Sequence, residues 1–366
     1  MKWKLLGIVI LVVVLVHALL FSCLMRHGKD DEQGGDAQIV ERDLENDVEQ
    51  PEFKYDTPQP SSQSPSDNTA VQANAREGGP LPSIHYVDGY YEMALAEMPA
   101  KLSQEINKCK QGICIDLTNR KILWAKGERT AGCIASMTKM MTVYLFMKDL
   151  RRTGSSLTLE TVVPATPEAC KTGGHQIYMD PKETFTLEEL LKCVLIRSAN
   201  DCALLMGQFL AGGSEEAFVK RMMDEAKEMG LDSFVFHNAH GLPVKLENGK
   251  KRLENMGSPI QLAFLAEQLM DIPEVVKWSS TKHDCIRENS PKFKRFDLDS
   301  TNTLLNNPSC PGVNGMKTGM TDGAGFCITA TCERNGRRMV VVAMGCANSR
   351  ERDALVRNIF NWAYSK

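Results

Sequence analysis

The sequence lacks the patterns that mark several common functional classes. Its 366 residues carry a formal net charge of −3 and no dense basic cluster with interleaved aromatic residues, so we expect no nucleic-acid partner. No Cys-x-x-Cys motif or Cys/His cluster has the spacing of metal ligands, and we expect neither a metal nor another cofactor. Gly-x-Ser-x-Gly is also absent. His237 and His240 fall in a predicted loop, where we interpret them as polar filler rather than as catalytic bases.

Cysteine, in contrast, is frequent, with 12 residues. When Cys23 is set aside in the apolar N-terminal segment the number is odd, so at least one thiol should stay free or pair between chains. We expect buried thiols together with a few disulfides, and the sequence assigns no pairs. Cys202 is expected to be a small packed residue rather than a second nucleophile.

Residues 1–26 differ in composition from the rest of the chain. Lys2 and Lys4 precede an apolar run from Leu5 to about Met25, close to the roughly 20 residues that a helix needs to cross a bilayer. The run is long for a cleavable signal peptide, and no small-x-small site closes it. We expect an uncleaved membrane anchor, and the alternative is a lipoprotein signal with Cys23 as the acylated residue. Few positive charges follow, so both interpretations place the rest of the chain outside the cytoplasm, in the periplasm or at the cell exterior.

Residues 27–82 are rich in Asp, Glu, Gln, Ser and Pro, with an acidic excess and few apolar side chains. Such a segment cannot bury enough apolar surface to offset the entropy of ordering, so we expect a disordered acidic stalk. The remaining residues, 83–366, are long enough to bury a large core and form the predicted catalytic domain.

This folded part contains patterns of both strands and helices. Clustered or alternating apolar residues predict strands, and Asn335-Gly336 is a strong hairpin turn signal between two of them. Thr186-Leu-Glu-Glu189 is a capping-box signature that predicts the start of a helix. The expected strands are 112–117, 121–125, 315–321, 325–333 and 338–345, and the expected helices are about 136–150, 186–196, 201–211 and 350–364.

Three short motifs occur in the order Ser136-Met-Thr-Lys139, Ser198-Ala-Asn200 and Lys317-Thr-Gly319. A serine hydroxyl is a weak nucleophile at neutral pH and needs a base. Lys139 lies three residues after Ser136, which places both on one face of a helix. Burial and the second cation, Lys317, would lower the pKa of Lys139 until its neutral amine can act as that base. At a helix N-terminus, the backbone N–H of Ser136 can also face a developing oxyanion.

Each motif alone carries little information. Ser-x-x-Lys is common on solvated helices, and Ser-x-Asn is typical of turns. A second Lys-Thr-Gly occurs at 171–173 among turn-forming residues, and we interpret that copy as a loop. The copy at 317–319 precedes a pair of strands, and the order of all three motifs favours a serine acyl-transfer site that needs no histidine.

The sequence around the motifs resembles the low-molecular-mass D-alanyl-D-alanine carboxypeptidases, which are penicillin-binding serine DD-peptidases. The resemblance covers about Gly112 to Trp362. It implies an α/β (α+β) serine β-lactamase/DD-peptidase fold, with an antiparallel sheet flanked by helices and a mainly helical subdomain. The stretches that carry it are Ala135–Thr142, Ser198–Asp201, Asn238-Ala-His-Gly-Leu242, Ser300–Leu305 and Gly315–Thr321.

The resemblance also implies roles for the matching catalytic residues. Ser136 would attack the peptide bond between the two terminal D-alanines of a peptidoglycan stem peptide and form an acyl-enzyme. Lys139 would be its general base, and Ser198 would relay a proton to the leaving group. β-Lactams would be covalent inhibitors at the same serine.

The substrate-binding residues follow from the same resemblance. Asn200 would hold the substrate amide, and the backbone N–H groups of Ser136 and Met320 would form the oxyanion hole. Arg352 matches an arginine that helps to hold the terminal carboxylate in relatives, and the alternative is a solvated arginine at a helix start. The carboxylate would be bound by the third motif, Lys317, Thr318 and Gly319.

Two other functions remain as alternatives. A β-lactamase of the same fold would carry Glu-x-x-x-Asn after the second motif, but the corresponding window, Asp232–Asn238, has no glutamate in that pattern. A β-lactam or muropeptide sensor would carry a cytoplasmic signalling domain, and only about four residues precede the predicted anchor. We therefore expect a carboxypeptidase.

Overall fold

The computed structural model describes residues 78–246, 252–288 and 290–366. These residues lie within one compact unit of the chain, 58–366. The predicted anchor, 1–26, and all but the last five residues of the predicted stalk lie outside the described residues. In the described part, no helix combines the length and the apolar character that crossing a membrane requires.

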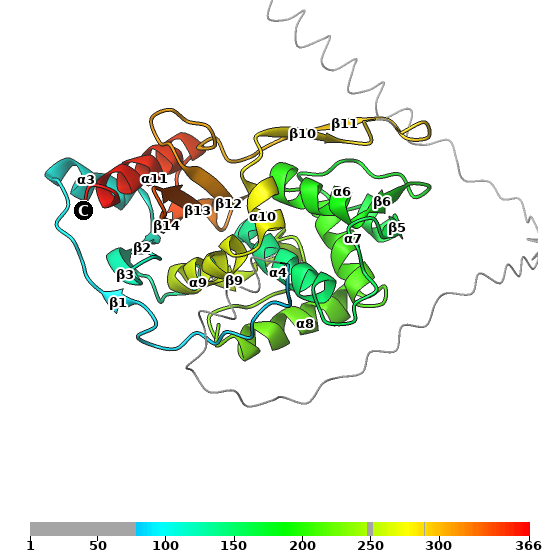
Figure 1. The fold of residues 1–366 in the computed structure, drawn as a ribbon, viewed down its shortest axis with the longest axis horizontal. Coiled ribbons are helices and arrows are strands. Elements are labelled where there is room, and N and C mark those ends of the chain that lie inside the picture. The colour runs from blue at the N-terminus through cyan, green and yellow to red at the C-terminus, as the bar shows by residue number, and fades with distance from the viewer. Residues whose placement is uncertain (1–77, 247–251, 289) are drawn as a thin grey trace, which may run out of the picture. The chain divides into compact units, whose positions relative to one another are not determined.

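A six-stranded sheet has the order β1-β3-β2-β14-β13-β12 (Figure 1). Neighbouring strands are antiparallel, as predicted, except that the short β1 pairs with β3 in parallel. The hairpin turn at Asn335 and Gly336 is confirmed, since both residues have the positive φ that a tight turn between strands requires. The strands are β1 (Glu92–Met93), β2 (Gln111–Asp116), β3 (Lys121–Lys126), β12 (Val313–Thr321), β13 (Gly325–Arg334) and β14 (Arg337–Cys346).

Helices cover both faces of this sheet, because successive side chains of a strand point to opposite faces. On β14, Met339, Val341 and Ala343 share a core with α11 (Ser349–Ala363). The alternate residues, among them Val340 and Val342, share the other core with α9 (Pro259–Met270). Figure 1 shows α11 and α9 on either side of the strands.

The second core extends into a mainly helical region built around α4 (Lys139–Leu150), which contacts α7, α8 and α9. Every residue of α4 from Lys139 to Met147 is buried, as its apolar sequence predicts. The other helices are α3 (Ala100–Glu105), α5 (Pro167–Cys170), α6 (Leu187–Lys192), α7 (Asn200–Leu210), α8 (Glu215–Glu228) and α10 (Pro273–Ser279). Short strand pairs connect them: β4 (Gly132–Cys133) with β9 (Met256–Gly257), β5 (Val162–Pro164) with β6 (Thr184–Thr186), β7 (Val244–Lys245) with β8 (Arg252–Leu253), and β10 (His283–Ile286) with β11 (Phe296–Asp299).

The predicted helix starts are confirmed, with two local differences. The capping box closes as expected: Thr186 Oγ1 accepts from Glu189 N at 3.1 Å, and Glu189 Oε2 accepts from Thr186 N at 3.0 Å. The helix that follows does not continue regularly to Ile196, because a π-helical turn, Cys193–Arg197, succeeds α6. A 3-10 turn, Ala135–Thr138, precedes α4.

The expectation of disulfides is wrong for the part of the chain that the structure describes. Every cysteine there is a free thiol, and most are buried. Cys202 is fully buried in α7, as expected of a packed residue. Burial raises the pKa of its thiol well above the ordinary value, because the thiolate would lose its hydration.

Candidate active site

The three motifs lie on different elements that meet at one place. Ser136 is in the 3-10 turn before α4, and Ser198 joins the π-helical turn to α7. The third motif is on β12, which packs against the turn that carries Ser136. Lys139 Nζ lies 3.0 Å from Ser136 Oγ, and Lys317 Nζ lies 2.7 Å from Ser198 Oγ.

The turn before α4 presents Ser136 to solvent while its neighbours are buried. Ala135 and Met137 are fully buried, whereas Ser136 is half-buried. Ala135 has a φ of 46°, an uncommon conformation for a residue with a side chain, and Thr138 Oγ1 donates to Ala135 O at 2.7 Å. Surrounding contacts therefore maintain a strained turn next to the candidate nucleophile, a common feature of active sites.

Lys139 is completely buried, with three oxygen atoms around its amine. Nζ lies 3.0 Å from Ser136 Oγ, 2.7 Å from Asn200 Oδ1 and 2.6 Å from the backbone oxygen of His240. Burial, and secondly the charge of Lys317, lower the pKa of Lys139 well below its ordinary value. A neutral amine has two N–H groups and one lone pair. The Asn200 and His240 oxygens only accept hydrogen bonds, so in the neutral form the two N–H groups would point at them and the lone pair would face the Ser136 hydroxyl.

The orientation of the Asn200 amide is set by the loop that contains the second Lys-Thr-Gly. Asn200 Nδ2 donates to Gly173 O at 2.8 Å, which leaves Oδ1 toward Lys139. Asn200 N donates to His175 O at 2.7 Å, and a Cβ on Gly174 would lie 2.8 Å from Asn200 Nδ2. The segment is a loop, as predicted, but it also borders the site. The sequence gives no signal for this contact, because it is made by backbone carbonyls.

Lys317 connects β12 to Ser198. It is 2% exposed, and besides Ser198 Oγ it donates to Thr318 O at 3.0 Å. Burial, together with the nearby charge of Arg352, lowers the pKa of Lys317 to about 7. Ser198 has a φ of 63°, and this left-handed conformation ends the π-helical turn just before the Asn200 position.

The remaining residues of the third motif border the nucleophile directly. A Cβ on Gly319 would lie 2.9 Å from Ile134 O and 3.2 Å from Ser136 N, so only glycine allows β12 this close. The Met320 side chain is 55% exposed. Thr318 Oγ1 lies 2.6 Å from Thr301 Oγ1. The sequence places Thr301 in the stretch Ser300–Leu305 but predicts no separate role for it.

The side chain of Arg352 donates hydrogen bonds to residues outside the three motifs. It is 4% exposed near the start of α11, so the solvated alternative is wrong. Its Nε donates to Asp353 Oδ1 at 2.7 Å and its Nη1 to Cys327 O at 3.2 Å. The guanidinium therefore influences the site because its positive charge lowers the pKa of Lys317.

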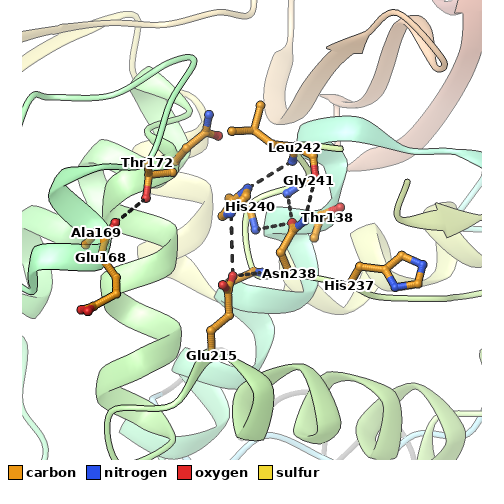
Figure 2. Close-up of polar contacts among 12 residues, drawn as sticks. Thr138, Glu168, Ala169, Thr172, Glu215, His237, Asn238, His240, Gly241 and Leu242 are labelled. Atoms are coloured by element: carbon orange, nitrogen blue, oxygen red, sulfur yellow. Dashed lines mark hydrogen bonds and ion pairs between the residues drawn. The ribbon is translucent and has the colours of Figure 1, made fainter. Parts of the chain in front are cut away.

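The loop Asn238–Leu242 contributes to the site through backbone atoms (Figure 2). Asn238 Oδ1 accepts from His240 N at 3.2 Å and from Gly241 N at 2.6 Å, and its Nδ2 donates to Leu242 O at 2.7 Å. Burial, with the Lys139 charge as a smaller cause, lowers the pKa of His240 to about 3, so its ring is no base near neutral pH. The sequence predicted no catalytic role for the His240 ring, and it did not predict that the His240 backbone oxygen contacts Lys139.

Comparisons with known proteins identify the family of the chain. A family model described as D-alanyl-D-alanine carboxypeptidase matches residues 98–348. The D-alanyl-D-alanine carboxypeptidase DacF of Bacillus subtilis is 34% identical over 274 residues, which cover 75% of this chain and 67% of that protein. DacC of Escherichia coli is 28% identical over 235 residues, 63% of this chain and 54% of that protein. The chain therefore matches between about half and two thirds of the length of these relatives.

Solved structures share the fold. A peptidoglycan synthesis regulatory factor (PBP3) from Streptococcus pneumoniae is 28% identical with a TM-score of 0.63, covering 70% of this chain and 72% of that one. Penicillin-binding protein D2 from Listeria monocytogenes, in its ampicillin-bound form, is 25% identical with a TM-score of 0.60, covering 70% and 98%. The predicted DD-peptidase fold is thus confirmed. Because the family model matches more than half of its length, the chain belongs to the D-alanyl-D-alanine carboxypeptidase family of serine peptidases.

Proposed function

We propose that this protein is a penicillin-binding serine D-Ala-D-Ala carboxypeptidase that removes the terminal D-alanine from peptidoglycan stem pentapeptides. The observation that carries the proposal is the environment of Lys139, whose buried amine lies 3.0 Å from Ser136 Oγ and contacts the oxygens of Asn200 and His240. The match to a carboxypeptidase family supports this activity over the β-lactamase and sensor alternatives.

Acylation follows from the positions of three side chains. Ser136 Oγ attacks the carbonyl carbon of the penultimate D-alanine while its proton passes to Lys139 Nζ, 3.0 Å away. The carbonyl oxygen becomes an oxyanion at the backbone N–H groups of Ser136 and Met320. When the peptide bond breaks, the proton taken up by Lys139 passes through the Ser198 hydroxyl, which lies against Lys317, to the leaving nitrogen, so Lys139 is neutral again. Free D-alanine departs and an ester on Ser136 remains.

Deacylation uses the same base, and the proton finally returns to Ser136. A water molecule replaces the leaving amine and gives its proton to the neutral Lys139 as it attacks the ester. The proton then returns to Ser136 Oγ when the ester bond breaks. A β-lactam ring acylates the same oxygen, but its leaving nitrogen stays attached to the acyl group.

Substrate binding is assigned to the residues around this centre. The protonated Lys317 and the hydroxyl of Thr318 hold the terminal carboxylate, and Gly319 lets β12 approach the turn that carries Ser136. Asn200 Nδ2 has a second N–H beyond the one given to Gly173 O, and it donates to the substrate amide. Arg352, which donates to Cys327 O on β13, adds a positive charge near Lys317 and so assists in holding the carboxylate.

The location of the enzyme follows from the N-terminal sequence. Residues 1–26 act as a membrane anchor, or as a lipoprotein signal, and residues 27–82 as an acidic stalk. The catalytic domain, 83–366, then lies outside the cytoplasm, where peptidoglycan is found. The composition of these segments supports this arrangement.

The central test uses the chain without the predicted anchor and the substitution Ser136→Ala. We expect covalent labelling by a fluorescent penicillin to disappear, and D-alanine release from a D-Ala-D-Ala pentapeptide to fall by about 10⁴-fold or more, because the nucleophile is lost. Ser156→Ala, at an exposed serine, should behave like the wild type. Labelling that survives in Ser136→Ala would contradict the proposed function.

The two lysines predict a bell-shaped pH profile of kcat/KM. On the acid side the rate falls because Lys139 becomes protonated and cannot accept a proton. On the alkaline side it falls because Lys317, with a pKa of about 7, loses the charge that holds the carboxylate. Lys317→Arg keeps that charge at every accessible pH, so the alkaline limb should disappear. An alkaline limb at the same pH in this variant would exclude Lys317 as its source.

Gly241→Ala should displace the turn that carries the nucleophile. Gly241 has a φ of 91°, and a Cβ there would lie 2.0 Å from Ala135 O and 2.9 Å from Ser136 N. We expect acylation to slow by about 100-fold, as for other small misplacements of reacting groups. Gly336→Ala, with a φ of 77° and open space around its Cβ, imposes similar backbone strain, about 1–3 kcal/mol, without the collision. Equal acylation rates in the two variants would show that the Gly241 contact does not position Ser136.

A further inference from the structure

We propose that Glu215 is a positioning residue for acylation, which acts through the loop Asn238–Leu242 on the carbonyl that holds Lys139. This inference rests on the proposed function. Glu215 is the first residue of α8, one of the helices packed on α4, and none of the three motifs contains it. Figure 2 shows its carboxylate beneath the loop.

The Glu215 carboxylate contacts two groups of the loop through one oxygen. Oε1 accepts from Ala239 N at 3.2 Å and lies 3.7 Å from His240 Nε2. Ala239 directly precedes His240, whose backbone oxygen accepts from Lys139 at 2.6 Å. The carboxylate is therefore bound to the backbone N–H of the residue that precedes His240, whose carbonyl contacts the general base.

One hydrogen bond of the His240 ring fixes its tautomer. Nδ1 lies 3.1 Å from Leu242 N, and a backbone N–H can only donate, so Nδ1 carries no hydrogen. The ring is neutral, and its hydrogen is on Nε2, the atom that faces Glu215 Oε1. The ring is thus bound by Leu242 N on one side and faces the Glu215 carboxylate on the other.

Helix α4 holds the same residue, Ala239, through its carbonyl. Thr142 Oγ1, one turn after Lys139, donates to Ala239 O at 2.7 Å. Ala239 therefore has its N–H bound by α8 and its carbonyl bound by α4. Asn255 Nδ2 adds bonds to Asn238 O at 3.0 Å and to Thr138 Oγ1 at 2.9 Å. With both sides bound, the next carbonyl, that of His240, has one position relative to Lys139.

This position decides whether the Lys139 amine accepts or donates at Ser136. If the His240 carbonyl moves away, one of the two N–H groups of the neutral amine is left without an acceptor in a buried site. That N–H then turns to Ser136 Oγ, the remaining oxygen within reach, and the lone pair no longer faces the hydroxyl proton. Glu215 therefore supports proton transfer without touching the substrate.

The test compares Glu215→Ala with Glu216→Ala and Glu215→Gln. Both alanine variants remove an acidic residue from the first turn of α8, so both change its helix-dipole interaction equally, but Glu216 is exposed. We expect Glu215→Ala to slow acylation by a fluorescent penicillin about tenfold, with the concentration for half-maximal rate unchanged. D-Alanine release should show the same fall in kcat at constant KM. Glu216→Ala should stay within about twofold of the wild type. Glu215→Gln should recover to within about threefold, because its amide oxygen can accept from Ala239 N.

The outcomes separate this inference from the proposed function. A wild-type chain that neither labels nor releases D-alanine overturns the proposed function and this inference with it. An active wild type with equal rates in Glu215→Ala and Glu216→Ala overturns the inference alone. So does a change in KM rather than in kcat, or a Glu215→Gln variant as slow as Glu215→Ala. Unfolding temperatures of all variants are measured alongside, and if Glu215→Ala does not fold, Glu215→Met takes its place, because it keeps the length of the side chain but has no oxygen to accept from Ala239 N.

Discussion

The buried amine of Lys139 is the group on which the rest of the site depends. Burial penalises the charged ammonium at this position more than the nearby Asp201 charge stabilises it, so the fold shifts Lys139 toward the neutral amine. With Lys317 as a neighbour, that preference becomes stronger. Neutrality makes the lysine a base, and the two oxygens of Asn200 and His240 then leave only one direction for its lone pair.

Most of the surrounding structure keeps those two oxygens in place. The loop through Gly173 fixes the Asn200 amide. The loop Asn238–Leu242 supplies the His240 carbonyl, and both α8 and α4 bind this loop at Ala239. Glycines permit the close approaches, since Gly241 and Gly319 lie where any Cβ would meet the turn that carries Ser136. The sheet contributes the strand β12 and, on it, a second buried lysine, Lys317. When protonated, Lys317 can bind a carboxylate by charge.

Features determined by local sequence were predicted correctly. The capping box at Thr186, the Asn335-Gly336 turn and the buried helix after Ser136 depend on neighbouring residues, and the structure confirms them. The contacts of Gly173, His240 and Glu215 were not predicted, because they use backbone atoms or pair residues far apart in the chain. The π-helical turn after α6 and the parallel pairing of β1 also have no local signature. The burial of Arg352 follows from how α11 packs on the sheet, which the sequence alone does not specify.

The protonation state of Lys139 is the most direct test of its role as the general base. Lysine labelled with ¹³C at Cε and ¹⁵N at Nζ, with the signal assigned by its loss in Lys139→Arg, can be titrated by NMR in the folded chain. We predict a Lys139 signal that titrates well below the ordinary lysine value of about 10.4. A Lys139 signal that titrates near 10.4, together with the exposed lysines, would contradict it.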